Sequence, residues 1–317
     1  MVTIIDRTLT NLKTNEINSQ DLNHFCDLLF NCGVTKIELT SALVSQLKSP
    51  TLAGDANMLN HPGNFFLVQA VDPEHQKIWR LEPNELLEKS LPIDNFSSFH
   101  NQKIRLIGLD DLMTQDYPSF FSNLLNSGAD TFDLCPGNHN YCATAIALEW
   151  LIAGGTSVSC QFASNHDFAP LEEVLMALKL HDSTLFSGDL SVLNELRCLY
   201  EKISNDRIAQ NKAIIGTDIF KVESGIHVDG VLKNPQTYEP FNPQMVGNQR
   251  EIVVGKHSGR QSILYKLKEQ NLSETATRNL LKQIKGRCTQ LGRNLSDWEL
   301  RTLASEVQND YKQKICC

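Results

Sequence analysis

The side chains best suited to acid–base chemistry lie in one segment of the last third of the chain, residues 222–263. His227 stands in the string ESGIH, and Tyr238 ends LKNPQTY a short distance later. A histidine exchanges a proton near neutral pH, and a glycine-containing turn could deliver it to a cleft. The alternative is that His227 only ties this segment to the rest of the protein by a hydrogen bond.

A second candidate set surrounds the string GKHSGR, residues 255–260. Such a turn could bind a carboxylate or a phosphate through its cationic side chains, or it could be purely structural. The candidate substrate-binding residues of the whole segment are Glu223, Lys256, His257, Ser258 and Arg260.

The elements that must position these residues alternate between short β-rich runs and amphipathic helices, which is typical of a parallel sheet covered by helices. One helix is predicted over 19–33, with Ser19 as its N-cap and Gly33 as its stop. Six or seven strands are predicted, and those with clear bounds are 3–6, 34–40, 65–71, 104–110, 131–135 and 157–162.

This α/β pattern favours a TIM-type (β/α) barrel, which usually takes about 250 residues. Only 1–212 are available for it, so the barrel must be compressed or incomplete. Residues 216–262 are rich in glycine, proline and asparagine, and residues 213–265 are expected to form an extended lid and linker arm. Residues 266–317 should form a small helical subdomain, whose last helix opens with a capping box from Ser296 to Glu299.

The composition favours small-molecule chemistry. The net charge of -8 and a pI near 5.6 give no basic patch for nucleic acid. No stretch is apolar enough to span a membrane, and the first residues lack the pattern of a secretory signal, so a cytoplasmic protein is expected. The nine cysteines have irregular spacing in a long chain, which predicts reduced thiols.

The strings ESGIH, LKNPQTYE and GKHSGR, in this order within 222–263, resemble the lid and linker region of the homocitrate synthase / 2-isopropylmalate synthase family. The resemblance implies a β/α barrel with a metal site and a subdomain that covers the active site of the other protomer. It also implies a Claisen-type condensation of acetyl-CoA with a 2-oxo acid. His227 and Tyr238 match the lid residues that reach into the neighbouring barrel.

The barrel portion departs from the family at its first strand. The family pattern is close to D-x-T-L-R-[DE]-G-x-Q, and residues 6–14 read DRTLTNLKT. Asp6 matches, but Thr10 stands at the catalytic arginine and Asn11 at the metal-binding acid. Threonine cannot supply a guanidinium group, and a neutral amide is a poorer ligand for a hard cation than a carboxylate.

A second departure concerns the H-x-H-N-D strand, which places two metal-binding imidazoles on one side of the family's barrel. No two histidines stand two residues apart here. Within 128–157, either Cys135 and Gly137 replace the two histidines or the metal strand has been deleted, and the sequence leaves both readings open.

The loop 163–168, ASNHDF, is a third departure because it replaces the family's G-E-R-x-G-N. His166 and Asp167 could form a new acid–base or ligand pair, but such a loop is more often a turn with local hydrogen bonds. A related reading is a self-sufficient enzyme whose chemistry has moved to Asp6, Cys135 and His166.

The lid is complete while the barrel lacks its metal-binding groups, which favours a subunit of a two-component homocitrate synthase. This chain alone would bind no metal, and a homologous partner barrel would hold Mg, Mn or Zn and receive the lid, so the protein is expected to form hetero- or homo-oligomers through lid exchange. The alternatives are a non-catalytic regulatory or scaffolding homologue and an enzyme similar to 2-isopropylmalate or citramalate synthases.

The residues after 265 are too few for a leucine-sensing domain, which favours homocitrate over isopropylmalate. The preferred 2-oxo acid, and the choice between nitrogenase cofactor assembly in nitrogen fixation and lysine biosynthesis, stay open at this point.

Overall fold

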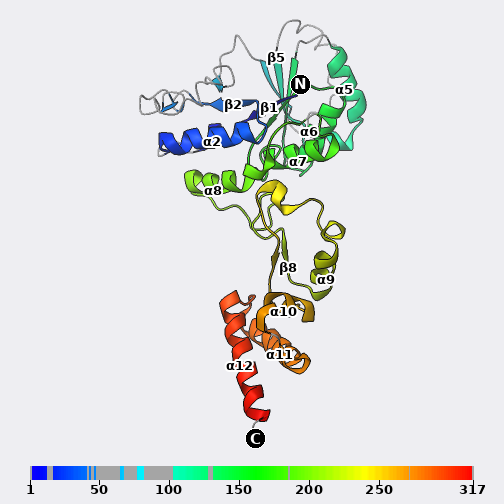
Figure 1. Cartoon of the computed structure of the whole chain (residues 1–317). Helices are drawn as coiled ribbons and strands as arrows, with labels where there is room; N and C mark the ends of the chain where they lie inside the picture. Colours follow the sequence, from blue (N-terminus) through cyan, green and yellow to red (C-terminus); the bar gives the residue numbers. More distant parts are fainter. Residues whose placement is uncertain are drawn as a thin grey trace. The chain divides into compact units, whose positions relative to one another are not determined.

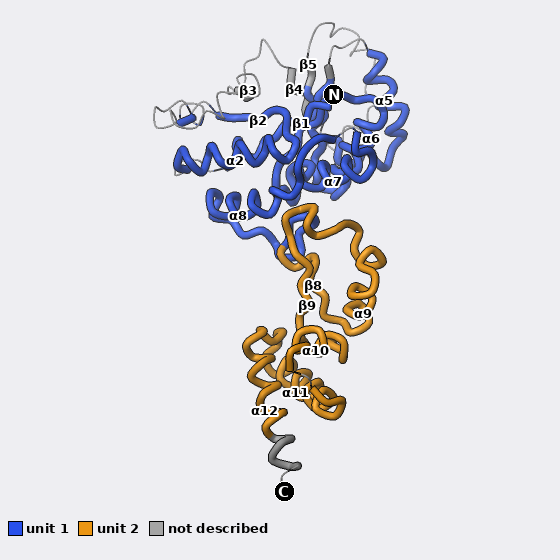
Figure 2. Tube along the Cα trace, in the orientation of Figure 1, with its two compact units in different colours: residues 1–216 blue, residues 217–317 orange. Residues whose placement is uncertain are grey.

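The protein is described from a computed structural model that covers residues 2–12, 17–40, 43, 46–47, 65–67, 77–81, 103–127, 131–184, 186–270 and 272–315. It divides into two compact units, residues 1–216 and 217–317, which Figure 2 distinguishes by colour. The boundaries predicted from sequence, after 212 and after 265, stay predictions.

Unit 1 is an α/β unit built on a parallel sheet. Its strands are β1 (Thr3–Asp6), β2 (Lys36–Leu39), β3 (Phe65–Leu67), β4 (Lys77–Leu81), β5 (Lys103–Gly108), β6 (Thr131–Pro136) and β7 (Ser157–Cys160). The strand order is β3-β2-β1-β7-β6-β5-β4. All six predicted strands are present in whole or part, although residues 68–71 of one of them lie outside the described residues, and β4 was not predicted with clear bounds.

The strand order follows the chain cyclically, because β7 pairs with β1 along its whole length, from Thr3 opposite Ser157 to Asp6 opposite Cys160. A last strand that returns to the first is the closing contact of a β/α barrel. The described pairings break only between β3 and β4, the two edge strands. The unit therefore has a TIM-like arrangement with a single break in its described ladder.

The helices of unit 1 cover this sheet, as Figure 1 shows. They are α1 (Thr8–Asn11), α2 (Ser19–Asn31), α5 (Tyr117–Asn126), α6 (Ala143–Ile152), α7 (Leu171–His181) and α8 (Leu193–Ser204), with short 3₁₀ turns η4 (Leu112–Thr114) and η5 (Leu190–Val192). The predicted N-cap of α2 was wrong by one residue: Asn18, not Ser19, accepts the backbone N–H of Asp21. Gly33 ends this helix region with φ +106°, as predicted.

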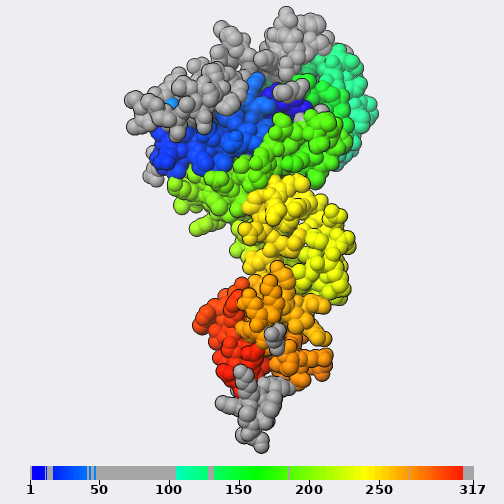
Figure 3. All heavy atoms as spheres, in the orientation of Figure 1, coloured from blue at the N-terminus to red at the C-terminus, as the bar shows by residue number. Residues whose placement is uncertain are grey.

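Unit 2 begins with a small parallel pair, β8 (Lys221–Val222) and β9 (Glu251–Ile252). Between them lie α9 (Gly225–Lys233), η6 (Pro235–Thr237) and η7 (Pro243–Val246). Figure 3 shows atoms of this segment, coloured yellow-green to yellow, on the surface of the unit. The prediction that His227 lies in a turn was wrong, because Gly225 starts a helix and His227 is inside it.

The rest of unit 2 is a helical subdomain with its own core. It contains α10 (Arg260–Lys266), η8 (Lys268–Gln270), α11 (Glu274–Leu291) and α12 (Asp297–Ile315). Leu280, Ile284 and Leu300 are almost fully buried in one cluster. The predicted capping box is present, since Ser296 N–H donates to Glu299 Oε2 over 2.8 Å and Glu299 N–H donates to Ser296 Oγ over 3.2 Å.

Candidate functional site

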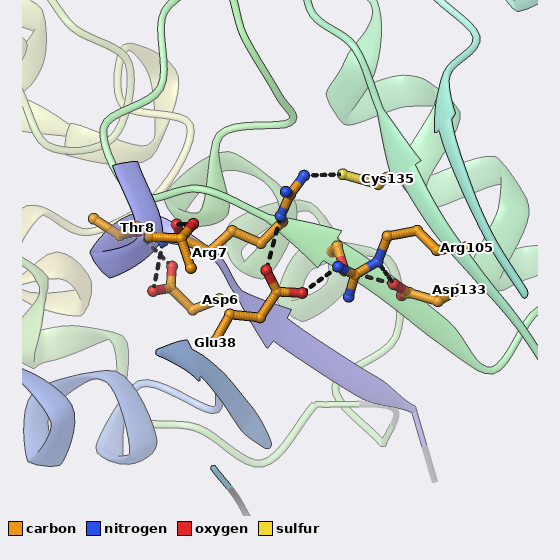
Figure 4. Close-up of polar contacts among 9 residues, drawn as sticks. Asp6, Arg7, Thr8, Glu38, Arg105, Asp133 and Cys135 are labelled. Carbon is orange, nitrogen blue, oxygen red and sulfur yellow. Dashed lines mark hydrogen bonds and ion pairs between the residues drawn. The ribbon is translucent and has the colours of Figure 1, made fainter. Parts of the chain in front are cut away.

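The strands of unit 1 carry a buried network of charged side chains, shown in Figure 4. Glu38 of β2 is fully buried and receives two guanidinium groups. Arg7, just after β1, donates from Nε to Glu38 Oε2 over 3.0 Å, and Arg105 of β5 pairs with Oε1. Arg105 Nε also donates to Asp133 Oδ2 of β6 over 2.5 Å. The network thus joins four strand segments across the sheet.

The carboxylate of Asp133 accepts hydrogen bonds from two neighbouring strands, β5 and β7. Besides Arg105, it accepts hydrogen bonds from the hydroxyls of Ser157 (2.8 Å) and Ser159 (2.6 Å) on β7. Burial opposes the charge on Arg105, but the neighbouring Asp133 and Glu38 outweigh it and raise the pKa of this guanidinium above its ordinary value. The two arginines are therefore permanent positive charges inside the unit, held by two carboxylates.

Cys135 belongs to the same network. Arg7 Nη1 lies 3.0 Å from Cys135 Sγ, and the Arg7 guanidinium lies 4.4 Å from the centre of the Phe168 ring. Burial raises the pKa of the Cys135 thiol to about 11, although the two arginines act in the opposite direction. The thiol is therefore protonated near neutral pH, so it is a poor nucleophile and a poor metal ligand.

The residues at and after the first strand, which the family uses for catalysis and metal binding, are here engaged in local structure. Asp6 is fully buried, and its Oδ2 accepts the Thr8 hydroxyl over 2.6 Å. Burial raises the pKa of Asp6 to about 7. The Thr10 hydroxyl donates to the carbonyl of Arg7 over 2.7 Å, so it is directed at the backbone. Asn11 ends α1, and its side chain lies outside the described residues.

These residues do not fit a divalent cation. Among the described residues, no group of three or more histidine, cysteine, aspartate and glutamate side chains could hold a metal ion. The two carboxylates of the network are already neutralised by Arg7 and Arg105. A cation placed beside them would meet two fixed positive charges and a protonated thiol, which is unfavourable on electrostatic grounds.

In one reading of the sequence, Gly137 replaces the second metal-binding histidine of the family. The space around Gly137 is filled by another side chain. A Cβ atom at residue 137 would lie 2.4 Å from Asp110 Oδ2. The carboxylate of Asp110, which follows β5, therefore fills the space next to the backbone of Gly137. Asp110 in turn receives the backbone N–H of His139 over 2.8 Å, so it fixes the start of this loop.

Sequence reasoning missed the pair formed by Asp110 and His139. Asp110 Oδ1 lies 3.0 Å from His139 Nδ1, and the carboxylate is buried while the His139 side chain is 68% exposed. A buried carboxylate beside one ring nitrogen orients an imidazole and leaves its other nitrogen accessible. The available signal was position alone, because both residues lie in the loops that follow strands of a β/α unit.

The alternative pair His166 and Asp167 is not joined by any hydrogen bond or ion pair of the described residues. His166 Nε2 lies 3.5 Å from the Tyr141 hydroxyl, with the two rings in edge contact. The carbonyl of Asp167 accepts the backbone N–H of Asn138 over 3.3 Å. These contacts tie the loop 163–168 to the segment that follows β6 and do not form an acid–base pair. The described contacts also join none of Asp6, Cys135 and His166 to one another.

In unit 2 the structure brings His227 and Tyr238 together. His227 lies on α9 and Tyr238 follows η6, and their ring centres are 5.2 Å apart with the planes tilted by 53°. Both side chains are exposed, and Ile226 beside them is 78% exposed. An imidazole and a phenol in contact on an open surface can pass a proton to or from a molecule that docks there.

The GKHSGR turn packs against the segment before α9. Glu223 Oε1 accepts the backbone N–H of His257 over 2.7 Å, and the buried Ser258 hydroxyl accepts that of Gly255 over 2.9 Å. Gly225 and Gly259 are in direct backbone contact, which leaves no room for a side chain at either position. Glu223 and Ser258 therefore hold the turn in place.

The cationic side chains of this turn remain accessible. Lys256, His257 and Arg260 are exposed, with Arg260 in a loose pair of 3.6 Å with Glu274. Their role in substrate binding stays a prediction. Beyond Tyr238, the surface has a recess of about 690 Å³ lined by Asn234, Pro235, Gln236, Glu239, Pro240, Phe241, Asn242 and Arg250.

Comparison with known proteins identifies similar sequences. Residues 214–294 match the family described as "Homocitrate synthase post-HMGL domain-like". The chain is 32% identical to the homocitrate synthase omega subunit of Clostridium pasteurianum, over 98% of this chain and 97% of that protein.

Two other relatives match to different extents. Homocitrate synthase AksA of Methanothermobacter thermautotrophicus is 42% identical over 43% of this chain and 36% of its own length. (R)-citramalate synthase CimA of Methanocaldococcus jannaschii is 29% identical over 86% of this chain and 63% of its own length. The similarity to the first relative spans both units. No described helix is long and apolar enough to cross a membrane.

Proposed function

Because this chain belongs to the homocitrate synthase / 2-isopropylmalate synthase family of acyl-CoA condensing enzymes, we propose that it is one subunit of a two-component homocitrate synthase. Its His227 and Tyr238 would complete the active site of a homologous partner that carries the metal. The reaction would be the condensation of acetyl-CoA with 2-oxoglutarate.

One contrast within the chain supports this proposal. The network of unit 1 fills the strands with paired arginines and carboxylates, while the imidazole and phenol of unit 2 are exposed and in contact with each other. An exposed imidazole and phenol can transfer a proton to or from a substrate when a second molecule covers them. The name of the Clostridium relative, an omega subunit, agrees with a divided enzyme.

In this mechanism the chain contributes proton transfer. A base removes a proton from the methyl group of acetyl-CoA, the resulting carbanion attacks the keto carbon of the 2-oxo acid, and water then cleaves the thioester to release CoA. The divalent cation of the partner barrel, Mg, Mn or Zn, would polarise the keto group. His227 and Tyr238 would hold or move a proton at the imidazole nitrogen and the phenol oxygen, and their contact keeps the two groups in one place.

The first experiment mixes the purified chain with the purified partner, supplies acetyl-CoA and 2-oxoglutarate, and measures CoA release. We expect turnover only in the mixture. Full turnover by the partner alone would end the proposal. Replacing 2-oxoglutarate by pyruvate or by 2-oxoisovalerate tests the alternative that the enzyme makes citramalate or isopropylmalate, as several relatives do by name.

The second experiment separates a catalytic arm from a regulatory or scaffolding role. His227→Ala should lower kcat of the mixture by about 100-fold or more if the imidazole transfers a proton. The matched control is His181→Ala, at the exposed C-terminal end of α7, which should leave kcat unchanged. A normal rate with His227→Ala, in a complex that still forms, would instead favour the regulatory or scaffolding role.

A further inference from the structure

Gly230 lies inside α9, one turn after His227. A glycine in a helix interior costs about 1 kcal/mol relative to alanine, so its presence calls for a local cause. Backbone freedom is not that cause, because Gly230 is not among the residues with positive φ. The space around Gly230 supplies a steric cause.

The ring of Tyr238 occupies the space that a side chain at residue 230 would need. A Cβ atom there would lie 2.1 Å from Tyr238 Cε2 and 2.7 Å from the phenol oxygen. Ordinary contact begins at 3.4 Å. The Tyr238 ring therefore rests directly against the backbone of α9, and the same ring lies 5.2 Å from the ring of His227.

The chain between the two residues returns Tyr238 to the helix. Asn234 N–H donates to the carbonyl of Gly230 over 2.8 Å, and Tyr238 N–H donates to the carbonyl of Pro235 over 3.0 Å. Proline at the start of η6 limits the conformations of this turn. The turn fixes the position of the Tyr238 backbone. The absence of a side chain at Gly230 determines how closely the Tyr238 ring can approach α9.

We infer that Gly230 is a positioning residue for the His227–Tyr238 pair, because only a residue without a Cβ lets the Tyr238 ring cross α9 and reach the imidazole. This inference rests on the proposed function for its catalytic consequence. Its structural part, the contact between the two rings, can be tested on the isolated chain.

The test compares two glycine-to-alanine changes in helices of the same unit. In Gly230→Ala the ring must move from 2.1 Å to at least 3.4 Å from the new methyl group. In the control Gly286→Ala, within α11, the new methyl group meets nothing within 4 Å. Both changes replace a helical glycine by alanine, which raises helix propensity, so a displaced ring in only one of them reports the Tyr238 contact.

The first readout is the NMR signal of the His227 ring in the isolated chain, assigned by its loss in His227→Ala. A ring 5.2 Å away shifts this signal through its ring current, so Gly230→Ala and Tyr238→Leu should move it and Gly286→Ala should not. An unmoved signal in Gly230→Ala would overturn the inference whatever the activity of the mixture.

The second readout is turnover in the mixture with the partner. Gly230→Ala should lower kcat by about 10- to 100-fold, as a displacement of about 1 Å does in active sites, with little change in KM for either substrate. In a Tyr238→Phe background, Gly230→Ala should lower kcat much less, because the phenol it displaces is already missing. Equal losses in both backgrounds would overturn the inference.

Two further results keep the outcomes apart. If Gly230→Ala does not fold, the double variant Gly230→Ala/Tyr238→Ala removes the ring and should fold. Failure of this double variant would overturn the steric explanation. If His227→Ala leaves kcat unchanged, the proposed catalytic arm fails, while the NMR comparison still decides whether Gly230 places the ring.

Discussion

The two units keep their ionisable groups in opposite ways. In unit 1 Glu38 and Arg105 are buried, Asp133 is partly buried, and their charges are matched to one another. In unit 2 His227 and Tyr238 are exposed. Buried charges that are satisfied inside a protein contribute to one fixed structure, whereas exposed groups remain free to meet a substrate or a partner. The comparison agrees with the proposal that the arm, and not the sheet, supplies the acid–base groups.

Removing the central carboxylate of unit 1 should produce the largest effect. Glu38→Gln leaves the guanidinium groups of Arg7 and Arg105 without their shared counter-ion in a buried position. Breaking such a pair costs about 3–5 kcal/mol, so the urea midpoint of unit 1 should fall steeply.

The control for this variant is Glu195→Gln. Glu195 pairs with His24 at the surface, where the two side chains are 60% and 48% exposed, and its loss should change stability by no more than about 0.5 kcal/mol. If Glu38→Gln were as mild as the control, the network would not hold the sheet together and the contrast between the units would lose its basis.

The pH dependence of stability should report on two buried carboxyl groups of unit 1. Burial raises the pKa of Asp6 and of Glu172 to about 7. The folded state then keeps protons that the unfolded chain loses above about pH 4, so the free energy of unfolding decreases as pH rises from about 4 to about 7 and levels off above. The expected slope is about 1 kcal/mol per pH unit for each carboxyl.

Urea unfolding of the chain and of Asp6→Asn between pH 5 and pH 8 measures this slope. The slope of unfolding free energy against pH should be smaller in Asp6→Asn by the contribution of one carboxyl. The control Asp189→Asn should keep the full slope, because hydrogen bonds from Ser191 lower the pKa of Asp189 and place its titration below this range. Stability that rises with pH over the same interval would contradict burial as the cause.

The capping box of α12 gives a smaller and local effect in unit 2. Ser296→Ala removes the hydroxyl that accepts the N–H of Glu299 over 3.2 Å, and loss of such an N-cap costs about 1 kcal/mol. Thermal melting followed by circular dichroism should show a lower transition for the helical subdomain. Ser305→Ala, on the exposed side of the same helix, is the control and should leave the transition in place.

Local patterns allowed part of this structure to be predicted. Short β-rich runs marked β1 and β2, and the spacing of Ser296 and Glu299 marked the start of α12. The strand β4 was missed because its sequence, KIWRL, places charged residues within a short apolar run. His227 was placed in a turn because its flanking glycines suggested one, although Gly230 is a glycine for steric reasons.

The candidate sites also differ in how far they could be predicted from sequence. His227 and Tyr238 could be proposed from sequence because their strings resemble a family. The network of unit 1 could not, since Arg7 and Glu38 are separated by 31 positions and Arg105 and Asp133 by 28. Such pairs meet only because neighbouring strands of a sheet bring them together, and no local pattern reports which strands become neighbours.

The smallest expected effect comes from adding metal. A cation near the strands of unit 1 would face the guanidinium groups of Arg7 and Arg105, whose carboxylate partners are already engaged. Without preferential binding to the folded state there is no stabilisation by mass action, so MnCl₂ or EDTA should leave the melting temperature of unit 1 unchanged. The double variant Thr10→Arg/Asn11→Asp, which restores the two family residues, should still bind no Mn²⁺ in a titration followed by EPR, because the guanidinium groups remain. Stoichiometric Mn²⁺ binding by either form would show that the paired charges can separate to admit a cation, and would contradict the proposal that the metal belongs to the partner barrel alone.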